Sequence, residues 1–528
     1  MNLLDLLAIP RSRDPEKTAL VFAAEAWSYR RLFTTARRVA GELARRGVGP
    51  GDRVALVMAN RPEMAASFLA ILHLGAVALP VNTAYRRREL AHILEDAEPA
   101  LVITEAAQRS VLEEVARGEG GDRPEATARR VAERAVEVGA LIATADGSGP
   151  PLPHPGNGLA MLLYTSGTTG RSKGAMITHA NLTASITGLL AAWAWRREDR
   201  LLLTLPLFHV HGLVVGLLTA LAASATVELT RRFDAAEVAG RLAREDGPSV
   251  FFGVPTMYVR LVDELRRRQE QGASGPSDAS GLNVSPAARL FASGSAPLSP
   301  ETFAAFRDLT GHTILERYGM TETGITLSNP YAGERRPGSV GQPLPGVSAR
   351  IVDGDGTPVP PGTEGELQVA GAGVCAGYWR DPEKTSAAFV SDPGDAAGRR
   401  WFSTGDLARR DPATGAHTLL GRSHDMILTG GYNVYPREVE AALEALPWVA
   451  EAAVAGLPDR DRGELVAAWL VPAPGDPGSQ VAVPDGDGLR DALAGSLAAF
   501  KVPRRVFLVT ELPRNALGKV QRHRLTPG

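Results

Sequence analysis

Short apolar runs rich in valine, leucine and isoleucine alternate with longer helix-forming stretches through most of the chain. The runs at 53–59, 76–82 and 99–105 have the length and composition of buried strands. Between them, residues 62–76 and 86–97 are rich in alanine or arginine, which is typical of helices. Strands that alternate with helices in this way predict an α/β protein with largely parallel sheets.

The pattern changes near residue 349. Residues 349–371 contain closely spaced turns and alternating positions, which predict a small β-rich subdomain. The last 100 or so residues contain a helix, strands, another helix and a tail, and a segment of that size can fold alone. We therefore expect stacked α/β sheets and the β-rich subdomain in residues 1–422, and a smaller α+β domain in residues 423–528.

The composition narrows the range of partners. Of 528 residues, 44% are hydrophobic and 22% are charged, and the net charge of -2 with both signs interspersed argues against a nucleic-acid surface. The single cysteine, Cys375, excludes an internal disulfide and all-cysteine metal sites, and it fits a reducing cytoplasm. No secretory or transit pattern is visible at the start, so we expect a cytoplasmic protein.

One segment is long and apolar enough to raise the question of a membrane span. Residues 201–227 contain no Asp, Glu, Lys or Arg. However, Pro206, His209 and His211 interrupt the run, and PLFHVHG is typical of a turn between a strand and a helix. We expect a buried strand, loop and helix here and no membrane span; a membrane transporter is the alternative.

The segment YTSGTTGRSKG at 164–174 has the composition of a phosphate-binding loop, and we expect it to join a strand to a helix. Glycines let the backbone approach an anion, while hydroxyls and backbone N–H groups bind phosphate oxygens. The spacing is not that of a P-loop, and for this segment alone a flexible linker is the alternative. The candidate phosphate-binding residues are Ser166, Gly167, Thr168, Thr169, Gly170 and Lys173.

Five further motifs follow downstream. They are LFASGSAPLS (290–299), ERYGMTETG (316–324), WFSTGDLARR (401–410), GRSHDMILTGGYNVYPREVE (421–440) and PRNALGKVQR (513–522). With YTSGTTGRSKG, they resemble in order and spacing the core motifs of the adenylate-forming superfamily of acyl-CoA synthetases, peptide-synthetase adenylation domains and luciferases. The resemblance implies activation of a carboxylate as an acyl-adenylate with ATP and Mg²⁺, followed by transfer to CoA. A P-loop NTPase motor would have no role for the last motif.

The resemblance implies a metal and phosphate site. Glu322 matches the residue that holds Mg²⁺ near the ATP phosphates, and a hard cation requires a carboxylate. Thr165 and Thr321 match positions that face the phosphates. Taken without the family, Glu322 could cap a helix and the threonines could be ordinary turn residues.

The resemblance also implies an adenosine site. Tyr318, followed by Gly319, matches the ring that stacks on adenine, with the turn Gly294, Ser295 and Ala296 on the other side. Asp406 matches the carboxylate that binds the ribose diol, for which a bidentate acceptor is suited, and Arg422 would support the ribose and phosphate. A core tyrosine and a turn aspartate are the plain alternatives.

The C-terminal motifs imply a domain that moves. Lys519 matches the catalytic lysine that bridges the substrate carboxylate and the α-phosphate, so its domain must close over the site. The same domain would then swing to place Gly430 and Gly431 against the channel for the pantetheine thiol. His424 and Asp425 occupy the hinge region, where the family commonly has Asp or Lys directly after Gly-Arg, and either could be the pivot.

The motifs indicate the class of reaction more closely than they indicate the carboxylic acid substrate. His209 follows Phe208 where amino-acid adenylation domains commonly have aspartate, which disfavours an amino acid. The motifs around 205–213, 254–261 and 289–298 are most similar to malonyl-CoA synthetases. In that family an arginine matching Arg289 holds the second carboxylate, by two-pronged pairing. We expect malonate or methylmalonate, with a medium- or long-chain fatty acid as the alternative; the oligomeric state is not predicted.

Overall fold

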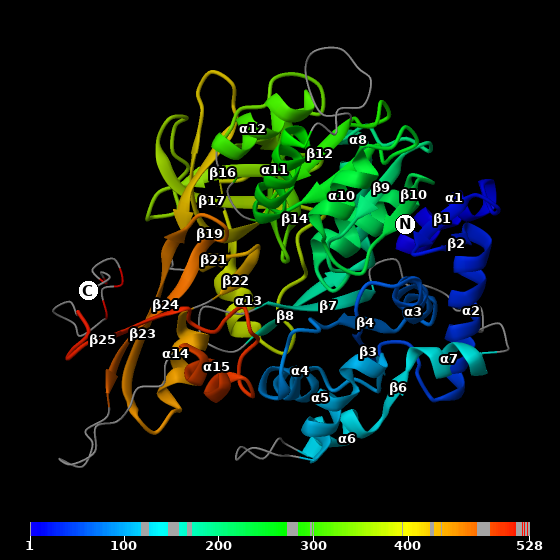
Figure 1. Cartoon of the computed structure of the whole chain (residues 1–528), viewed down its shortest axis with the longest axis horizontal. Helices are drawn as coiled ribbons and strands as arrows, with labels where there is room; N and C mark the ends of the chain where they lie inside the picture. Colours follow the sequence, from blue (N-terminus) through cyan, green and yellow to red (C-terminus); the bar gives the residue numbers. More distant parts are fainter. Residues whose placement is uncertain are drawn as a thin grey trace.

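The computed structural model describes residues 2–117, 126–145, 158–165, 172–271, 284–295, 298, 300–392, 394–422, 427–434, 436–472, 486–513, 520, 522 and 525. Three sheets organise these residues, two in the larger part of the molecule and one near the C-terminus (Figure 1).

The first sheet has six strands and is mostly parallel. Its order is β6 (Ala135–Glu137), β5 (Leu101–Thr104), β3 (Arg53–Val57), β4 (Val77–Pro80), β7 (Leu159–Thr165) and β8 (Lys173–Thr178), with β8 antiparallel to β7. The apolar runs predicted as strands therefore form a parallel sheet, and the buried faces of β3, β4 and β5 explain their continuous hydrophobicity.

The second sheet has fourteen strands, and its strand pairing changes from parallel to antiparallel along the sheet. The parallel part consists of β1 (Thr18–Phe22), β10 (Thr226–Leu229), β9 (Arg200–Leu203), β11 (Val250–Gly253), β12 (Leu290–Ser293) and β13 (Ile314–Met320), with β2 (Glu25–Ser28) antiparallel at the edge. From β13 onward the pairing is antiparallel through β14 (Gly324–Ser328), β15 (Ser339–Pro343), β20 (His417–Arg422), β19 (Arg400–Arg410), β17 (Glu364–Gly371) and β16 (Val347–Val352), and β18 (Phe389–Ser391) pairs with β19. The predicted β-rich region is thus continuous with the parallel sheet.

Helices form three layers around these two sheets. Helices α3 (Pro62–His73), α8 (His179–Ala192) and the π-helix η1 (His211–Leu218) share one apolar core with the facing sides of both sheets. The outer side of the first sheet packs against α4 (Arg87–Ala97), α5 (Ala106–Arg117) and α6 (Ala126–Glu133), and that of the second against α10 (Ala235–Leu242), α11 (Pro255–Glu270) and α12 (Pro300–Thr310). The remaining helices of this part are α1 (Leu3–Arg13), α2 (Tyr29–Arg45), α7 (Val138–Thr144), α9 (Thr219–Ala222) and α13 (Pro382–Ala388). The predicted α/β architecture of stacked sheets is confirmed.

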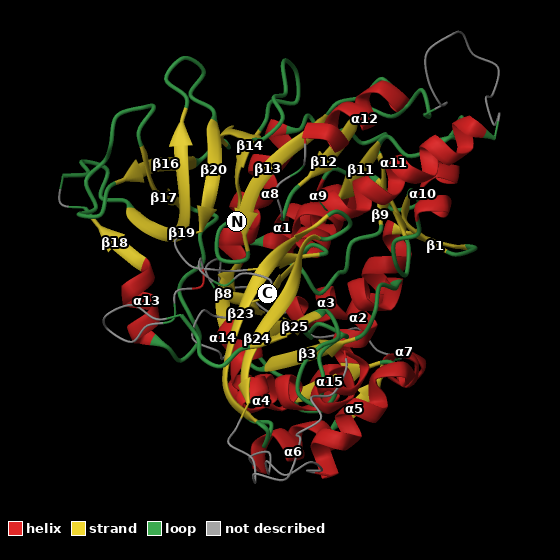
Figure 2. Cartoon of the chain, turned by 60° about the vertical axis from the view of Figure 1, so that its left-hand side comes forward, coloured by secondary structure: helices red, strands yellow, loops and turns green. Residues whose placement is uncertain are grey.

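The third sheet is separate and lies in the C-terminal part. It contains β22 (Tyr432–Val434), β21 (Ile427–Thr429), β24 (Gly463–Pro472) and β23 (Val449–Asp459), with β25 (Arg505–Leu508) parallel to β24, and α14 (Pro436–Glu444) and α15 (Gly486–Leu493) share its core. We call residues 427–525 the C-terminal unit. It lies beside α4 of the first part (Figures 1 and 2).

The strand that follows the predicted phosphate-binding segment differs from our expectation. Residues 173–178 form β8, which pairs antiparallel with β7, and α8 begins only at His179. The prediction that the segment joins a strand directly to a helix was wrong, because KGAMIT pairs with β7 before the chain turns into the helix. The register places Lys173 opposite Thr165.

Residues 201–227 fold as β9, η1, α9 and the start of β10, inside the core that joins the two sheets. Within the described part of the chain, no helix has the length and apolar character needed to cross a membrane.

Candidate active site

Two predicted site residues from distant parts of the sequence meet at the end of β7. Thr165 Oγ1 donates a hydrogen bond to Glu322 Oε1 over 3.3 Å, although 157 positions separate them. Glu322 lies in the turn between β13 and β14 and is buried. The half-buried Thr321 precedes it in the same turn. A carboxylate and a hydroxyl therefore face one another next to the loop predicted to hold phosphates.

Tyr378 completes this cluster and was missed by the sequence reasoning. Its hydroxyl donates to the same Oε1 of Glu322 over 3.1 Å, and Lys173 Nζ lies 5.0 Å from the centre of its ring. Burial and the nearby Lys384 lower the pKa of Lys173 against the opposing effect of Glu322. The only feature in the sequence that pointed to Tyr378 was an aromatic hydroxyl in the turn-like stretch GYW.

A second pair of predicted residues meets on β13 and β19. Tyr318 OH donates to Asp406 Oδ2 over 2.5 Å, and both side chains are buried. Asp406 is further oriented because its own N–H donates to Thr404 Oγ1 over 3.1 Å. In the ladder between β19 and β20, Asp406 lies opposite Arg422, of which only the backbone is described. The predicted adenosine residues therefore come from three strands of one sheet: β19 and β20 are neighbours, while β15 and β14 separate β20 from β13 in the strand order.

Two glycines are closely packed here, Gly319 beside Tyr318 and Gly294 beside Arg317. A Cβ at Gly319 would lie 2.0 Å from the carbonyl oxygen of Gly324, across the β13–β14 hairpin. A Cβ at Gly294 would lie 2.5 Å from Cζ of Arg317. Ser295 follows Gly294 with φ +74°, so the chain turns sharply as it leaves β12.

Arg317 is the most unusual charge near the site, and the sequence reasoning overlooked it. It is 4% exposed, and its Nε and Nη2 have no hydrogen-bond partner among the described residues. Burial lowers its pKa to about 9, so the guanidinium is charged at neutral pH. An arginine inside the strand ILERYGM was the available clue, since buried arginines are normally paired.

His211 lies near this guanidinium. Burial lowers the pKa of His211 well below its usual value, and Arg317 and His209 act in the same direction. Neither ring nitrogen of His211 has a hydrogen-bond partner among the described residues. Successive strand residues point to opposite faces, so Arg317 and Tyr318 lie on opposite faces of β13. The Arg317 face is the one that meets η1 and His211.

The C-terminal unit touches the same region through its β21–β22 hairpin. The ring of Tyr432 lies 6.2 Å from that of His209, whose own ring is 4.9 Å from Phe208. Gly431 has φ +81°, and a Cβ there would lie 2.9 Å from Cγ2 of Val254. His209 is exposed to solvent, yet desolvation by the surrounding protein lowers its pKa to about 4.

Arg289, predicted to bind a second carboxylate, is not at the site. Its Nε donates to Asp199 Oδ1 over 2.8 Å, Nη2 pairs with Asp199 Oδ2, and Nη1 donates to the carbonyl of Trp193 over 3.1 Å. It precedes β12, whereas Gly294 follows it, so the two lie at opposite ends of the strand. We correct this prediction, because a guanidinium already paired at the amino end of the sheet cannot receive the acid.

Several predicted residues lie outside the described part of the chain. Gly430 is described, and its N–H donates to the carbonyl of Arg462 over 3.0 Å. The predicted residues that are not described are Ser166, Gly167, Thr168, Thr169, Gly170, Ala296, His424, Asp425 and Lys519.

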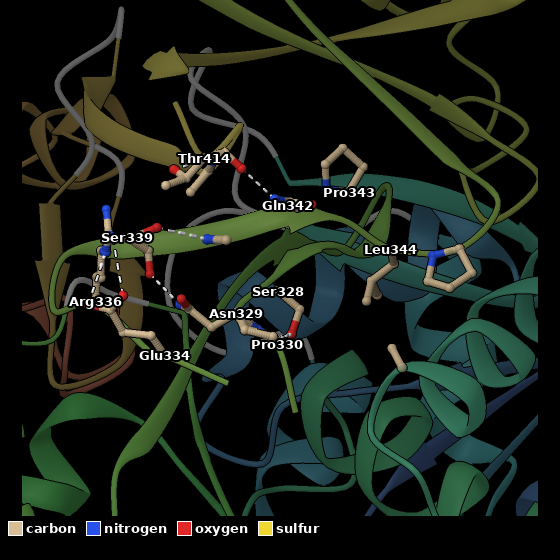
Figure 3. Close-up of a pocket in the computed structure, with 14 residues that line it drawn as sticks. Ser328, Asn329, Pro330, Glu334, Arg336, Ser339, Gln342, Pro343, Leu344 and Thr414 are labelled. Carbon is tan, nitrogen blue, oxygen red and sulfur yellow. Dashed lines mark hydrogen bonds and ion pairs between the residues drawn. The ribbon is translucent and has the colours of Figure 1, made fainter. Parts of the chain in front are cut away.

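A crevice of about 350 Å³ lies along β14 and β15 (Figure 3). Its polar side chains bond to protein: Asn329 donates to the carbonyls of Glu316 and Ser339, and Gln342 donates to that of Thr414. No predicted site residue lines it. Over the described ranges there is also no group of three or more His, Cys, Asp or Glu side chains that could hold a metal, so Glu322 would need oxygen ligands from elsewhere.

Comparison with known proteins gives the family. The model of the AMP-binding enzyme matches residues 10–379, and that of the AMP-binding enzyme C-terminal domain matches residues 438–519. The mitochondrial malonate–CoA ligase of Mus musculus is 36% identical over 97% of this chain and 88% of its own length. The feruloyl-CoA synthase of an Amycolatopsis species is 34% identical over 96% of this chain and 94% of its own length.

Solved structures similar to this chain are also CoA ligases or CoA synthetases. A malonyl-CoA ligase with methylmalonyl-CoA and AMP bound is 36% identical, covers 94% of this chain and 97% of its own, and superposes with a TM-score of 0.77. The o-succinylbenzoate CoA synthetase of Bacillus subtilis, 28% identical, gives 0.82 in a double mutant bound to a product analogue and 0.67 in its AMP complex. The double mutant covers 98% of this chain and the AMP complex covers 99%; each matches over 98% of its own chain.

The fold and these matches define the chain as a member of the AMP-binding enzyme family. Within that family it is an adenylate-forming carboxylate–CoA ligase that uses ATP and CoA.

Proposed function

We propose that the acid is malonate or a malonate with a small substituent, such as methylmalonate. The observation that carries this proposal is Arg317, a buried guanidinium beside Gly294 and near His211, two of whose nitrogens have no partner among the described residues. A carboxylate pairs with a guanidinium through two parallel hydrogen bonds, and that would satisfy the buried charge. The malonate–CoA ligase and the complex with methylmalonyl-CoA described above support the same choice.

A medium- or long-chain fatty acid fits less well. Its alkyl chain would meet Arg317 and leave a buried charge unpaired, which is unfavourable. His211 is neutral near pH 7 and adds no second positive charge that would call for another anion. The identity to a feruloyl-CoA synthase is nearly as high, so similarity alone does not select the acid, and the proposal of malonate is supported mainly by Arg317.

The nucleotide residues would act as follows. Glu322 and Thr165 supply a carboxylate and a hydroxyl, an oxygen donor set that fits Mg²⁺ when phosphates and water complete the shell. Lys173 and the loop before it would bind the departing phosphates. Asp406 would accept hydrogen bonds from the ribose hydroxyls, and Tyr318 would stack on adenine.

The chemistry consists of two displacements without a nucleophilic side chain. In the first, a carboxylate oxygen of the acid attacks the α-phosphorus, the bond to the bridging oxygen breaks, and pyrophosphate leaves. Lys519 would stabilise the charge that develops between the carboxylate and the α-phosphate. In the second, the CoA thiol attacks the acyl carbon, loses its proton and displaces AMP. The protein contributes position and charge, which can supply most of the rate.

The described arrangement fits the second displacement. The β21–β22 hairpin, which carries Gly430 and Gly431, lies against Val254 and His209. The Bacillus subtilis synthetase superposes better in its complex with the thioester product analogue than in its AMP complex. For adenylation, the C-terminal unit would turn to present Lys519 instead, with His424 or Asp425 in the hinge.

The cytoplasm remains the expected compartment. The supporting observation is the one cysteine, Cys375, which is buried and whose pKa burial raises to about 12, so it is an unreactive thiol.

The substrate is tested with malonate, methylmalonate, acetate, octanoate and palmitate in the presence of ATP, Mg²⁺ and CoA. We expect AMP formation with malonate and methylmalonate to exceed that with the other acids. In Arg317→Met the malonate rate should fall roughly 100-fold, the loss expected when a buried charge partner is removed. The acetate rate should change little.

The matched control is Arg289→Met combined with Asp199→Asn, which removes the ion pair at the other end of β12. The ratio of malonate to acetate activity should be unchanged in this variant, because that ratio does not depend on the amount of folded enzyme. If Arg317→Met kept the wild-type ratio, or octanoate were the preferred acid, the proposed substrate would be wrong.

A further inference from the structure

Lys501 is a buried lysine that contacts carboxylates from both parts of the molecule. Its Nζ lies 2.8 Å from Oε1 of Glu89 on α4 and 2.6 Å from Oε1 of Glu438 on α14. The side chains of Lys501, Glu89 and Glu438 are 3%, 8% and 15% exposed. Figures 1 and 2 both place α15, which precedes Lys501 in the chain, beside α4.

The charges of this triad depend on one another. Burial opposes the charge on Lys501, but Tyr85, Glu438 and Glu89 outweigh it, so its pKa is raised. Burial and Glu438 raise the pKa of Glu89, while Lys501 acts in the opposite direction. Without the ammonium, two buried carboxylates would face each other. A buried carboxylate that loses its cationic partner strongly destabilises the folded protein.

The two ion pairs have different roles because they connect different parts. Lys501 and Glu438 both belong to the C-terminal unit and can stay paired wherever that unit lies. Glu89 belongs to α4 of the first part, so its pair with Lys501 exists only while the unit is docked in the described arrangement. The Glu89–Lys501 pair therefore stabilises docking without being needed to fold either part.

A row of aromatic rings connects the triad to His209 and Val254, the residues against which the β21–β22 hairpin lies and which we call the acyl site. Lys501 Nζ lies 5.7 Å from the ring centre of Phe500 and 4.9 Å from that of Tyr85. Phe500 stacks on Tyr432 with ring centres 4.2 Å apart and planes at 21°. Tyr432 in turn lies 6.2 Å from His209. A lysine fixed by Glu89 thus fixes the hairpin that carries Gly431.

We propose that Lys501 and Glu89 are positioning residues for thioester formation, and that their interdomain ion pair holds the β21–β22 hairpin at the acyl site. This inference rests on the proposed two-step function. Neither residue touches the reacting atoms. Adenylation, for which the C-terminal unit must leave this position, does not need the pair.

Glu89→Gln is the sharpest test. The amide keeps the size of the side chain and an oxygen that can accept from the N–H of Arg86, the 2.9 Å bond that caps α4. The two half-reactions are measured separately, as malonate-dependent exchange of pyrophosphate into ATP and as single-turnover consumption of preformed malonyl-adenylate by CoA. We expect exchange within about twofold of wild type and CoA-dependent consumption to slow roughly tenfold.

Two further variants separate docking from general structure. Glu133→Gln removes an exposed carboxylate on α6 of the same layer and should leave both half-reactions within about twofold of wild type. Lys501→Gln should slow CoA-dependent consumption as Glu89→Gln does, and the double variant should lose much less than the product of the two effects, because they remove one interaction.

The docked population provides a readout independent of activity. Spin labels are attached at Leu508→Cys and Glu113→Cys, two exposed positions on the C-terminal unit and on α5. The native Cys375 is buried and should not react. We expect one dominant distance in the otherwise wild-type enzyme and a broader distribution in Glu89→Gln.

The outcomes are distinct. Equal slowing of both half-reactions in Glu89→Gln, or an unchanged rate of CoA-dependent consumption, would overturn the positioning role. A wild-type enzyme that exchanged no pyrophosphate with any acid of the panel would instead overturn the proposed function. In that case the distance measurement would still decide whether the pair holds the two parts together.

Discussion

At the residue scale, Tyr378 contacts two predicted site residues. Its hydroxyl donates to Glu322, and its ring faces the ammonium of Lys173. An aromatic face attracts a cation, and a hydroxyl bonded to a carboxylate fixes the direction of the lone pairs that remain for a metal. Tyr378 therefore orients both the proposed Mg²⁺ ligand and the proposed phosphate-binding cation.

Tyr378→Phe separates these two effects. The ring stays under Lys173, and only the hydrogen bond to Glu322 is lost. We expect pyrophosphate exchange at limiting Mg²⁺ to fall roughly tenfold, the cost of a hydrogen bond to a charged group. Saturating Mg²⁺ should recover most of that loss. An equal loss at all Mg²⁺ concentrations would contradict the role in holding the metal ligand.

Glu316 gives a prediction for the dependence of stability on pH. Burial raises its pKa to about 7, although the N–H groups of Gly338 and Leu298 act in the opposite direction. A carboxyl with a raised pKa binds its proton more tightly in the folded protein than in the unfolded chain. The free energy of unfolding must then fall as pH rises from the unfolded pKa of about 4.5 to about 7.

Glu316→Gln should remove this pH-dependent loss. We expect the difference in Tm, wild type minus variant, to become more negative by several degrees between about pH 5 and about pH 8. Thermal unfolding at the two values measures it. Only the change with pH is decisive, because the amide also alters the two backbone hydrogen bonds at every pH. A difference that stayed constant would show that Glu316 does not titrate in this range.

Individual side chains were also where sequence reasoning succeeded and failed most clearly. Thr165 contacts Glu322, and Tyr318 contacts Asp406, as expected for residues predicted to share one metal site and one adenosine site, although their roles remain predictions. The arginine for the acid was misplaced. Arg289 resembled the expected motif, but its partner Asp199 lies 90 residues away in the sequence, and no local pattern reveals that pair.

At the scale of elements, the β21–β22 hairpin carries two adjacent glycines at the contact with the larger part of the molecule. Both of its glycines have positive φ, but their surroundings differ. A Cβ at Gly431 would lie 2.9 Å from Val254, whereas at Gly430 the nearest atom is the end of the Arg462 side chain at 4.0 Å. Backbone strain is thus common to both positions, and crowding at the interface belongs to Gly431 alone.

Gly431→Ala should therefore impair thioester formation more than Gly430→Ala does. Both variants lose roughly 1 kcal/mol or more of stability through the positive φ. Only Gly431→Ala should slow CoA-dependent consumption of the acyl-adenylate, roughly tenfold, by pushing the hairpin away from Val254. Adding Val254→Ala should restore part of that rate. Equal effects of the two glycine substitutions on this step would contradict the packing argument.

The elements themselves followed mostly from their patterns. Buried strands and their helices in residues 53–105 were predicted because continuous apolar runs identify a sheet covered on both faces. The strand β8 was missed because its six residues run straight into α8, without a turn between them. A hairpin strand of this kind is recognised only once its partner β7 is known.

At the scale of the whole molecule, the proposed reaction would require the C-terminal unit to serve two steps with different surfaces. The described contacts of Val254 and His209 are with Gly431 and Tyr432. Sequence motifs predicted both surfaces, but not which one would be docked. That choice depends on contacts such as Lys501 with Glu89, which join residues 412 positions apart.

Lys519→Ala tests the alternation directly. We expect malonate-dependent pyrophosphate exchange to fall roughly a thousandfold, the upper end of what one electrostatic donor contributes. Conversion of preformed malonyl-adenylate to the thioester should stay near the wild-type rate, because that step uses the docked arrangement. Preserved exchange in this variant would show that the lysine has another role.

The neighbouring positions 317 and 318 on β13 have a consequence for evolution and engineering. Arg317 faces the proposed acid pocket, and Tyr318, on the other face of the strand, bonds to Asp406. In this proposal, one face of β13 selects the acid and the other face binds the nucleotide. Under the proposed function, substrate range can diversify by substitution at one face while the other keeps the nucleotide affinity, so a library at 317 and 211 should yield new acid preferences without raising the KM for ATP.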